Sequence, residues 1–179
     1  YCQDNEISWV NWDLSEQDKD LLEFTSTMMW LRRDHPVLRR RRFFTGDAGH
    51  GGESELGEIE WLTPAGESMT DQDWTTWYAR AMMVFLNGEA IAEPDERGQR
   101  IVDDSFLVLI NASDEDITFT LPGEGYAPTW KVALDTAPAV DGDSDPVLAA
   151  DDTVVVEARS MLFLIDAPDS DATTERHPR

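Results

Sequence analysis

Apolar side chains recur at intervals of three and four between residues 15 and 34, the spacing of one face of an α-helix. That face is formed by Leu21, Phe24, Met28 and Leu31. Ser15 and Asp18 resemble an N-terminal capping box, since a serine side chain can accept from the exposed N–H three residues later. The pair His35 and Pro36 ends the helix because a residue before proline is kept out of the helical region. The pattern predicts one long helix with an apolar face that needs burial.

Beyond residue 58 short β-prone runs recur between turn signals, which is typical of an antiparallel β-sandwich. The runs span residues 59–63, 76–86, 105–111, 117–121, 129–134, 153–158 and 160–166. Within 76–86 both alternating registers are largely apolar, which suits an inner strand. The glycine-rich stretch 46–58 reads as a polar loop that includes His50. The polar tail from Ala167 is expected to be disordered. The predicted fold class is mainly β.

The charge balance excludes several classes of partner. The formal net charge is −23, so the chain should repel nucleic acid and anionic lipid surfaces. Half of the 14 Lys and Arg residues lie before residue 45, and we expect Arg39 to Arg42 to pair with carboxylates. Cys2 is the single cysteine, so no disulfide forms within the chain. With no apolar run near membrane length and no leader pattern, the sequence predicts a cytoplasmic location.

Candidate catalytic chemistry is sparse. The acidic stretch 141–145 suggests Ca²⁺, but the glutamate that completes an EF-hand loop is missing. The three histidines, His35, His50 and His177, lie in a helix stop, a loop and a tail. No nucleophile pattern, phosphate loop or dinucleotide fingerprint is present. We therefore expect no catalytic residue, no metal site and no cofactor.

Seven tryptophans are the unusual signal, because indole faces can stack on sugar rings as well as fill cores. Trp77 and Trp130 lie inside strand patterns, and we expect both in the core. Trp9 and Trp12 precede the helix in a polar segment, and both readings stay open for them.

Seven stretches of sequence carry a family resemblance that covers nearly everything to about residue 166. The stretch "YCQDNEISWVNWDL" (1–14) and then "WLRRDHPVLRRRRFFTG" (30–46) resemble the end of the catalytic barrel in bacterial glycogen debranching enzymes of the isoamylase type. These enzymes belong to the α-amylase superfamily. The stretch "EIEWLTPAGESMTDQDW" (58–74) resembles the turn into the C-terminal domain of the same enzymes. Strands of their C-terminal β-sandwich are resembled by "DSFLVLINAS" (104–113), "FTLPG" (119–123), "WKVALDT" (130–136) and "ARSMLFL" (158–164).

The resemblance implies a fold and a division of the chain. Residues 1–45 would be a loop and helix left from the end of a (β/α)₈ barrel, and 46–57 a linker. Residues 58–166 would form the C-terminal β-sandwich, and 167–179 the disordered tail. Its partner would be the missing catalytic barrel, through which branched α-glucan would be reached.

The family hydrolyses α-1,6 branch linkages of glycogen-type glucans with retention, using an acid carboxyl and a nucleophilic carboxylate. The resemblance implies that both precede the segment matching Tyr1, so this chain would be non-catalytic and structural. On the loop that follows the eighth barrel strand, Tyr1, Asp4, Asn5 and Trp9 are the candidate substrate-binding residues. The alternative is an autonomous glucan-binding β-sandwich module that uses exposed tryptophans.

Overall fold

The computed structural model describes residues 2–44, 56–76, 79–137 and 147–167. These residues form two compact units, Tyr1–Asp34 and His35–Arg179. Tyr1, His50, Trp77, His177 and the predicted tail beyond Ala167 lie outside the described residues.

The first unit consists of a turn followed by helix α1 (Glu16–Asp34). Its start confirms the predicted capping box. The Asp18 N–H donates to the Ser15 hydroxyl at 3.2 Å, and the Ser15 N–H donates to the Asp18 carboxylate at 3.0 Å. Glu16 and Asp18 lie in the first turn and Arg32 and Arg33 in the last, which matches the polarity of the helix dipole. Within the described residues 2–34, no second helix or strand covers the apolar face of α1.

The cap should make α1 sensitive to acid. Hydrogen bonds from the Ser15 side chain and backbone lower the pKa of Asp18 below its ordinary value of 3.8. A lowered carboxylate pKa gives stability above the unfolded pKa, and this is lost as pH falls through the folded pKa. We expect far-UV circular dichroism to show helix loss on acidification that is smaller in Asp18→Asn, which lacks this titration. Glu23→Gln, in the middle of α1, is the matched control, and an acid response equal to wild type in Asp18→Asn would contradict the role of the cap.

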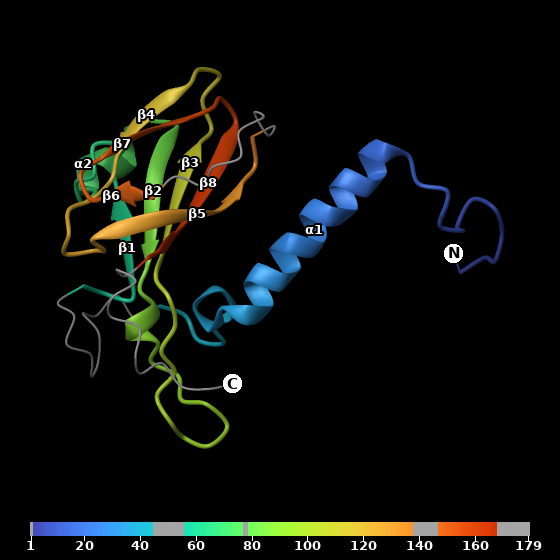
Figure 1. Ribbon diagram of the computed structural model, residues 1–179, viewed down its shortest axis with the longest axis horizontal. Coiled ribbons are helices and arrows are strands. Elements are labelled where there is room, and N and C mark those ends of the chain that lie inside the picture. The colour runs from blue at the N-terminus through green and yellow to red at the C-terminus, as the bar shows by residue number, and fades with distance from the viewer. Residues whose placement is uncertain (1, 45–55, 77–78, 138–146, 168–179) are drawn as a thin grey trace. The chain divides into compact units, whose positions relative to one another are not determined.

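The second unit is built on two antiparallel sheets (Figure 1). The larger has the strand order β1-β2-β3-β8-β5-β6 and the smaller pairs β4 with β7. The strands are β1 (Ile59–Leu62), β2 (Ala81–Leu86), β3 (Phe106–Asn111), β4 (Ile117–Thr120), β5 (Thr129–Asp135), β6 (Leu148–Ala149), β7 (Thr153–Val156) and β8 (Ser160–Asp166). Its described residues also form three short helices: η1 (Pro36–Arg39), α2 (Asp71–Thr75) and η2 (Gly88–Ala90).

The core lies between the two sheets. Phe119 and Val156 of the smaller sheet belong to the same buried cluster as Phe85, Leu107 and Trp130 of the larger one. The Phe85 and Trp130 rings meet edge to face with centroids 6.4 Å apart, a favoured aromatic geometry. This arrangement confirms the predicted mainly antiparallel β fold and the core position of Trp130.

The predicted run 76–86 is wrong at its start, because the strand begins at Ala81. Just before the predicted run lies α2, which ends at Thr75 and whose capping box joins Thr70 and Asp73. The Thr70 N–H donates to the Asp73 carboxylate at 2.8 Å, as Ser15 does with Asp18 in α1. The pattern T-x-x-D was therefore a readable helix start in the polar stretch just ahead of the predicted run.

No helix in the described parts of the chain is both long enough and apolar enough to cross a bilayer.

Candidate functional site

Three of the predicted substrate-binding residues, Asp4, Asn5 and Trp9, lie in a turn ahead of α1. Trp9 donates its indole N–H to the Asp4 carboxylate at 2.5 Å. Asn5 accepts the Ile7 N–H on its side-chain oxygen at 3.1 Å, and its backbone oxygen accepts from Ser8 and Trp9. The structure thus brings Asp4 and Trp9 together and gives Asn5 a turn-forming role. The Trp9 ring remains 64% exposed, and Tyr1 lies outside the described residues.

A shallow apolar groove of about 300 Å³ continues from this turn along the start of α1. Trp12 and Leu14 line it together with Leu21 and Leu22 of the helix. Trp12 is 84% exposed, so this groove belongs to the surface of the first unit.

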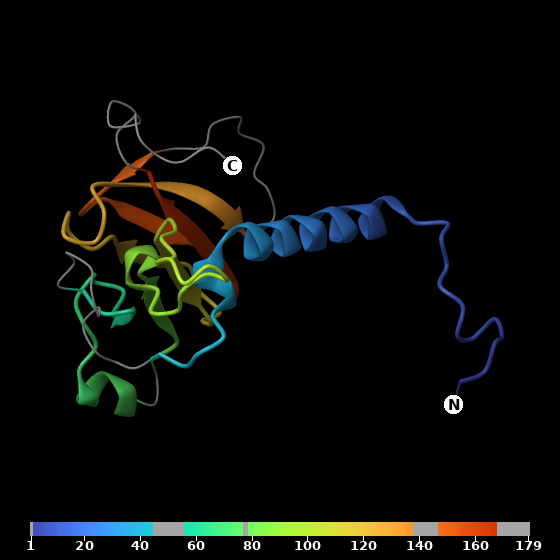
Figure 2. The same ribbon diagram turned by 90° about the horizontal axis from the view of Figure 1, so that it is seen from below.

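Residues 35–44, which we call the anchoring segment, begin the second unit and lie on the loop between β2 and β3. Both ribbon views show the segment in light blue beside that yellow-green loop (Figures 1 and 2). Three groups of polar contacts fasten the segment, and none of them was predicted from the sequence as a site.

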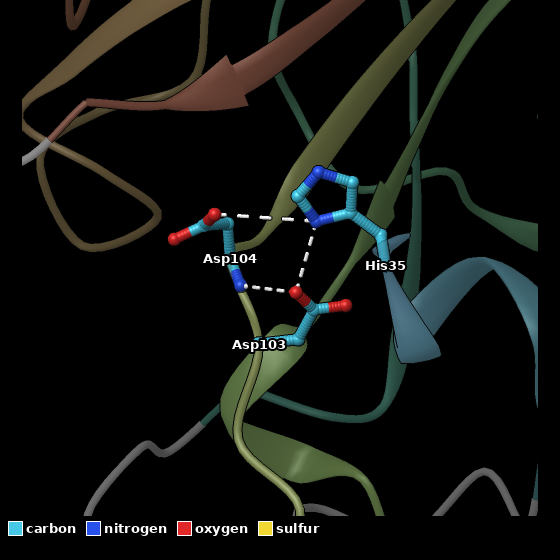
Figure 3. Close-up of side chains that lie close together, drawn as sticks. All are labelled: His35, Asp103 and Asp104. Carbon is cyan, nitrogen blue, oxygen red and sulfur yellow. Dashed lines mark hydrogen bonds and ion pairs between the residues drawn. The ribbon is translucent and has the colours of Figure 1, made fainter. Parts of the chain in front are cut away.

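The first contact joins His35 to the residues just before β3 (Figure 3). Its Nδ1 lies 2.9 Å from Asp103 Oδ1 and 4.0 Å from Asp104 Oδ2. The other oxygen of Asp103 accepts the Val37 N–H at 2.9 Å. The His35 ring also meets the Phe106 ring edge to face at 4.8 Å. The histidine and the carboxylate are largely buried, so this contact fixes the start of the segment.

The same three side chains offer one nitrogen and two carboxylates within 4.8 Å of one another, a possible donor set for a cation. Their hydrogen bonds favour a structural role instead. Asp103 Oδ1 accepts the Asp104 N–H at 2.9 Å and faces the histidine, and Oδ2 is occupied by Val37. The expectation of no metal ligand therefore stays a prediction.

The second contact buries an ion pair. Arg40 Nη1 lies 3.6 Å from Glu58 Oε2, with only 8% and 5% of the two side chains exposed. The guanidinium also donates to the Asn87 carbonyl at 3.0 Å. Burial lowers the pKa of Arg40, while the charges of Glu58 and Glu93 oppose that fall. An arginine stays charged in proteins, so Arg40 is a buried cation held by a carboxylate and a carbonyl.

The third contact joins the end of the segment, at Arg41 and Arg42, to Glu93. Its carboxylate accepts the Arg41 N–H at 2.8 Å and the Arg42 N–H at 2.5 Å. The Arg41 Nε lies 4.0 Å from the same carboxylate. The expected pairing of the arginine cluster with carboxylates is therefore confirmed for Arg40 and Arg41, and their partners belong to the sandwich unit.

The tryptophans that the structure describes in the sandwich divide into two groups. Trp130 is fully buried, whereas Trp61 on β1 and Trp74 on α2 are 38% and 51% exposed. Their rings meet edge to face, with centroids 5.3 Å apart and planes at 75°. They make one exposed aromatic pair and no flat platform.

A β-sandwich that holds the anchoring segment through largely buried contacts of His35 and Arg40 is thus the structural class of the second unit. The chain belongs to the isoamylase C-terminal family, since residues 58–167 match the family described as "Isoamylase, C-terminal".

Two curated relatives give the measure of the similarity. The chain is 50% identical over 164 residues to the glycogen operon protein GlgX homolog of Mycobacterium tuberculosis (strain ATCC 25618 / H37Rv), which covers 92% of this chain and 22% of that protein. It is 31% identical over 133 residues to the glycogen debranching enzyme of Dickeya chrysanthemi, covering 74% of this chain and 16% of that protein. The chain therefore spans about a fifth of the length of the curated relatives it matches.

Among solved structures, a pullulanase complexed with maltotetraose from Anoxybacillus sp. LM18-11 is similar with a TM-score of 0.50 at 12% identity. The match covers 88% of this chain and 17% of the pullulanase, and at this identity it supports the fold alone. Together the matches confirm the family resemblance of the sequence and its restriction to a C-terminal portion.

Proposed function

We propose that this chain is the C-terminal portion of a glycogen debranching enzyme that hydrolyses α-1,6 branch linkages of glycogen-type glucans. The family match and the name of the Dickeya relative support this assignment. Glycogen as the substrate class also accords with the proposed cytoplasmic location.

In this proposal the chemistry belongs to the preceding part of the enzyme. A retaining glycosidase needs two carboxyl groups about 5–5.5 Å apart on either side of the bond. The sequence resemblance puts both of them, together with the barrel that binds the branched glucan, ahead of the segment matching Tyr1. Residues 1–45 would be the end of that barrel and 58–166 the sandwich. Tyr1, Asp4, Asn5 and Trp9 stay proposed substrate-binding residues of the assembled enzyme.

The chain itself is non-catalytic and structural, and its sandwich holds the anchoring segment in place. The observation that carries this role is the anchoring segment, where Arg40 and Glu58 bury opposite charges 3.6 Å apart. A buried charge loses several kcal/mol of hydration, so this contact forms only with both partners in place. The sandwich thereby fixes the path of the chain that leads into it.

We expect no α-1,6-glucosidase activity from this chain by itself. The measurement is the release of linear chains from a branched maltooligosaccharide, with the full-length enzyme as positive control. The physical reason is the absence of the acid and nucleophile pair that the barrel would supply. Authentic product from the chain alone would contradict the non-catalytic role, and no product from the full-length enzyme would contradict the proposed function.

The exposed pair Trp61 and Trp74 favours a second candidate, a glucan-binding module. Following tryptophan fluorescence in the same tubes separates the two readings. Saturable quenching that is lost in both Trp61→Ala and Trp74→Ala would favour the module. The structural role predicts no quenching, because an edge-to-face pair offers no flat surface for consecutive sugar rings.

A further inference from the structure

The sandwich unit carries a large excess of negative charge. Between residues 56 and 167 the sequence has 23 acidic residues and only 5 basic ones. The four consecutive arginines of the anchoring segment, Arg39 to Arg42, leave most of that excess uncompensated. Like charges repel one another more strongly in the compact state, so a high net charge opposes folding while it favours solubility.

The fold brings part of this charge together at one end of the sandwich. Asp114, Glu115 and Asp116 lie in the connection between β3 and β4, and all three are exposed. Glu157, between β7 and β8, is exposed as well. It lies beside them, because the Asn111 side-chain amide donates to the Glu115 carbonyl at 2.9 Å and to the Glu157 carbonyl at 3.0 Å. Four carboxylates therefore share one small area of the surface.

The arginines at this end offset the four carboxylates only in part. Arg80 pairs with Asp114 at 3.5 Å, but both side chains are more than half exposed. An exposed pair of this kind contributes little to stability, and dissolved salt weakens it further. Arg159, whose N–H donates to the Ser113 carbonyl, is a second exposed cation here. Repulsion among the carboxylates therefore remains.

Salt acts differently on exposed and buried charges. The Debye length falls from about 10 Å in 0.1 M salt to about 3 Å in 1 M salt, so repulsion between exposed carboxylates fades over that range. A buried pair is screened much less. The Arg40–Glu58 and His35–Asp103 contacts are both largely buried. Concentrated salt should therefore relieve the repulsion on the surface of the sandwich and leave its main contacts with the anchoring segment intact.

We propose that the sandwich unit is adapted to concentrated salt, and that screening of its surface carboxylates by monovalent cations supplies part of its stability. The cations act as a diffuse atmosphere around the whole surface, and no single group of carboxylates needs to hold one. In such a medium the excess charge costs little stability, while it still keeps the chain soluble. This dependence on salt is independent of the reaction that the full-length enzyme carries out.

The melting temperature of this chain in potassium chloride tests the dependence. Near-ultraviolet circular dichroism reports on the sandwich unit, because Trp130 and Phe85 are buried in its core. Between about 0.1 M and about 2 M potassium chloride at neutral pH the melting temperature should rise by several degrees, as the Debye length shortens. A melting temperature that stays constant or falls would overturn the proposal.

Calcium chloride at millimolar concentration separates a diffuse atmosphere from a specific site. It hardly changes the ionic strength, so the melting temperature should stay close to its value in dilute buffer. If millimolar calcium chloride gives the same rise as molar potassium chloride, one cation site accounts for the stabilisation and diffuse screening is wrong.

A pair of double variants shows whether carboxylate repulsion causes the rise. Glu115→Gln with Glu157→Gln removes two charges from the acidic end, so it should raise the melting temperature in dilute buffer and shrink the further rise in potassium chloride. Glu115→Asp with Glu157→Asp is the matched control, since it keeps both charges and should keep the full rise. A rise in the glutamine variant equal to that of wild type would contradict a screening origin, because salt effects other than screening are common to both proteins.

Hydrogen exchange at Val37 tests whether the anchoring segment withstands the salt. The Val37 N–H donates to the Asp103 carboxylate at 2.9 Å, inside the largely buried part of the contact. Its exchange rate, measured relative to that of Leu109 in the core strand β3, should not increase in concentrated potassium chloride. Faster relative exchange at Val37 would show that long-range attraction of the arginines holds the segment, which would contradict adaptation of the unit to salt.

Discussion

Glu58→Gln is expected to destabilise the sandwich unit by about 3 kcal/mol, the lower end of the range for breaking a buried ion pair. The substitution keeps the shape of the side chain and removes its charge. Arg40 then remains buried, with 8% of its side chain exposed and no carboxylate in contact at the Glu58 position. The Asn87 carbonyl and the more distant Glu93 compensate it in part, which is why the lower end applies.

Urea unfolding followed by near-ultraviolet circular dichroism measures this loss, because Trp130 and Phe85 are buried in the core of the unit. The matched control is Asp114→Asn. Asp114 pairs with Arg80 at 3.5 Å, nearly the same separation, but both side chains are more than half exposed. Exposed pairs contribute about 0–1 kcal/mol, so the control should change little. Equal effects of the two substitutions would show that burial does not strengthen the Arg40–Glu58 contact.

A double variant shows whether the two charges act as one unit. Adding Arg40→Met to Glu58→Gln removes the unpaired cation, so the double variant should lose less stability than the two single variants added together. Residues in contact typically couple by about 0.5–3 kcal/mol. Strict additivity would mean that Arg40 is held by the Asn87 carbonyl without help from Glu58.

Local patterns predicted the elements of this fold well. The capping box of Ser15 and Asp18 placed the start of α1, and the apolar runs placed β3 and β8 to within a residue. Failures occurred where a local signal was overlooked or too short. The helix start at Thr70 lay in a polar stretch ahead of the predicted run 76–86 and was overlooked, and the two residues of β6 give no periodicity to recognise.

The contacts of the anchoring segment were not predictable in the same way. His35 and Asp103 are 68 positions apart, and Arg40 and Asn87 are 47 apart. Sequence periodicity describes neighbours along one helix or strand, whereas these partners are brought together by the fold of the sheet. Composition indicated that the arginines would find carboxylates, but not which ones. The family resemblance, by contrast, came from whole stretches of sequence and needed no knowledge of contacts.

A substitution at Gly88 would test whether the anchoring segment depends on the loop between β2 and β3. A Cβ added at Gly88 would lie 2.2 Å from the Asp103 carbonyl oxygen and 2.3 Å from that of Asp104. Both are backbone atoms, so neither can move aside by a rotamer change. The Asp103 N–H also donates to the Gly88 carbonyl at 3.1 Å, and this hydrogen bond holds the backbone of residue 88 next to that of residue 103. Gly88→Ala should therefore displace residues 103–104.

We expect Gly88→Ala to cost about 1–3 kcal/mol, the usual cost of overpacking a rigid site. Because Asp103 accepts the Val37 N–H and faces His35, the displacement should also loosen the anchoring segment. Amide hydrogen exchange at Val37 measures that second effect and should accelerate. Gly125→Ala is the matched control, since a Cβ there would have no atom within 4 Å apart from those of Gly125 and its two chain neighbours. If Gly88→Ala lowers stability but does not accelerate exchange at Val37, then close packing at Gly88 does not support the anchoring segment.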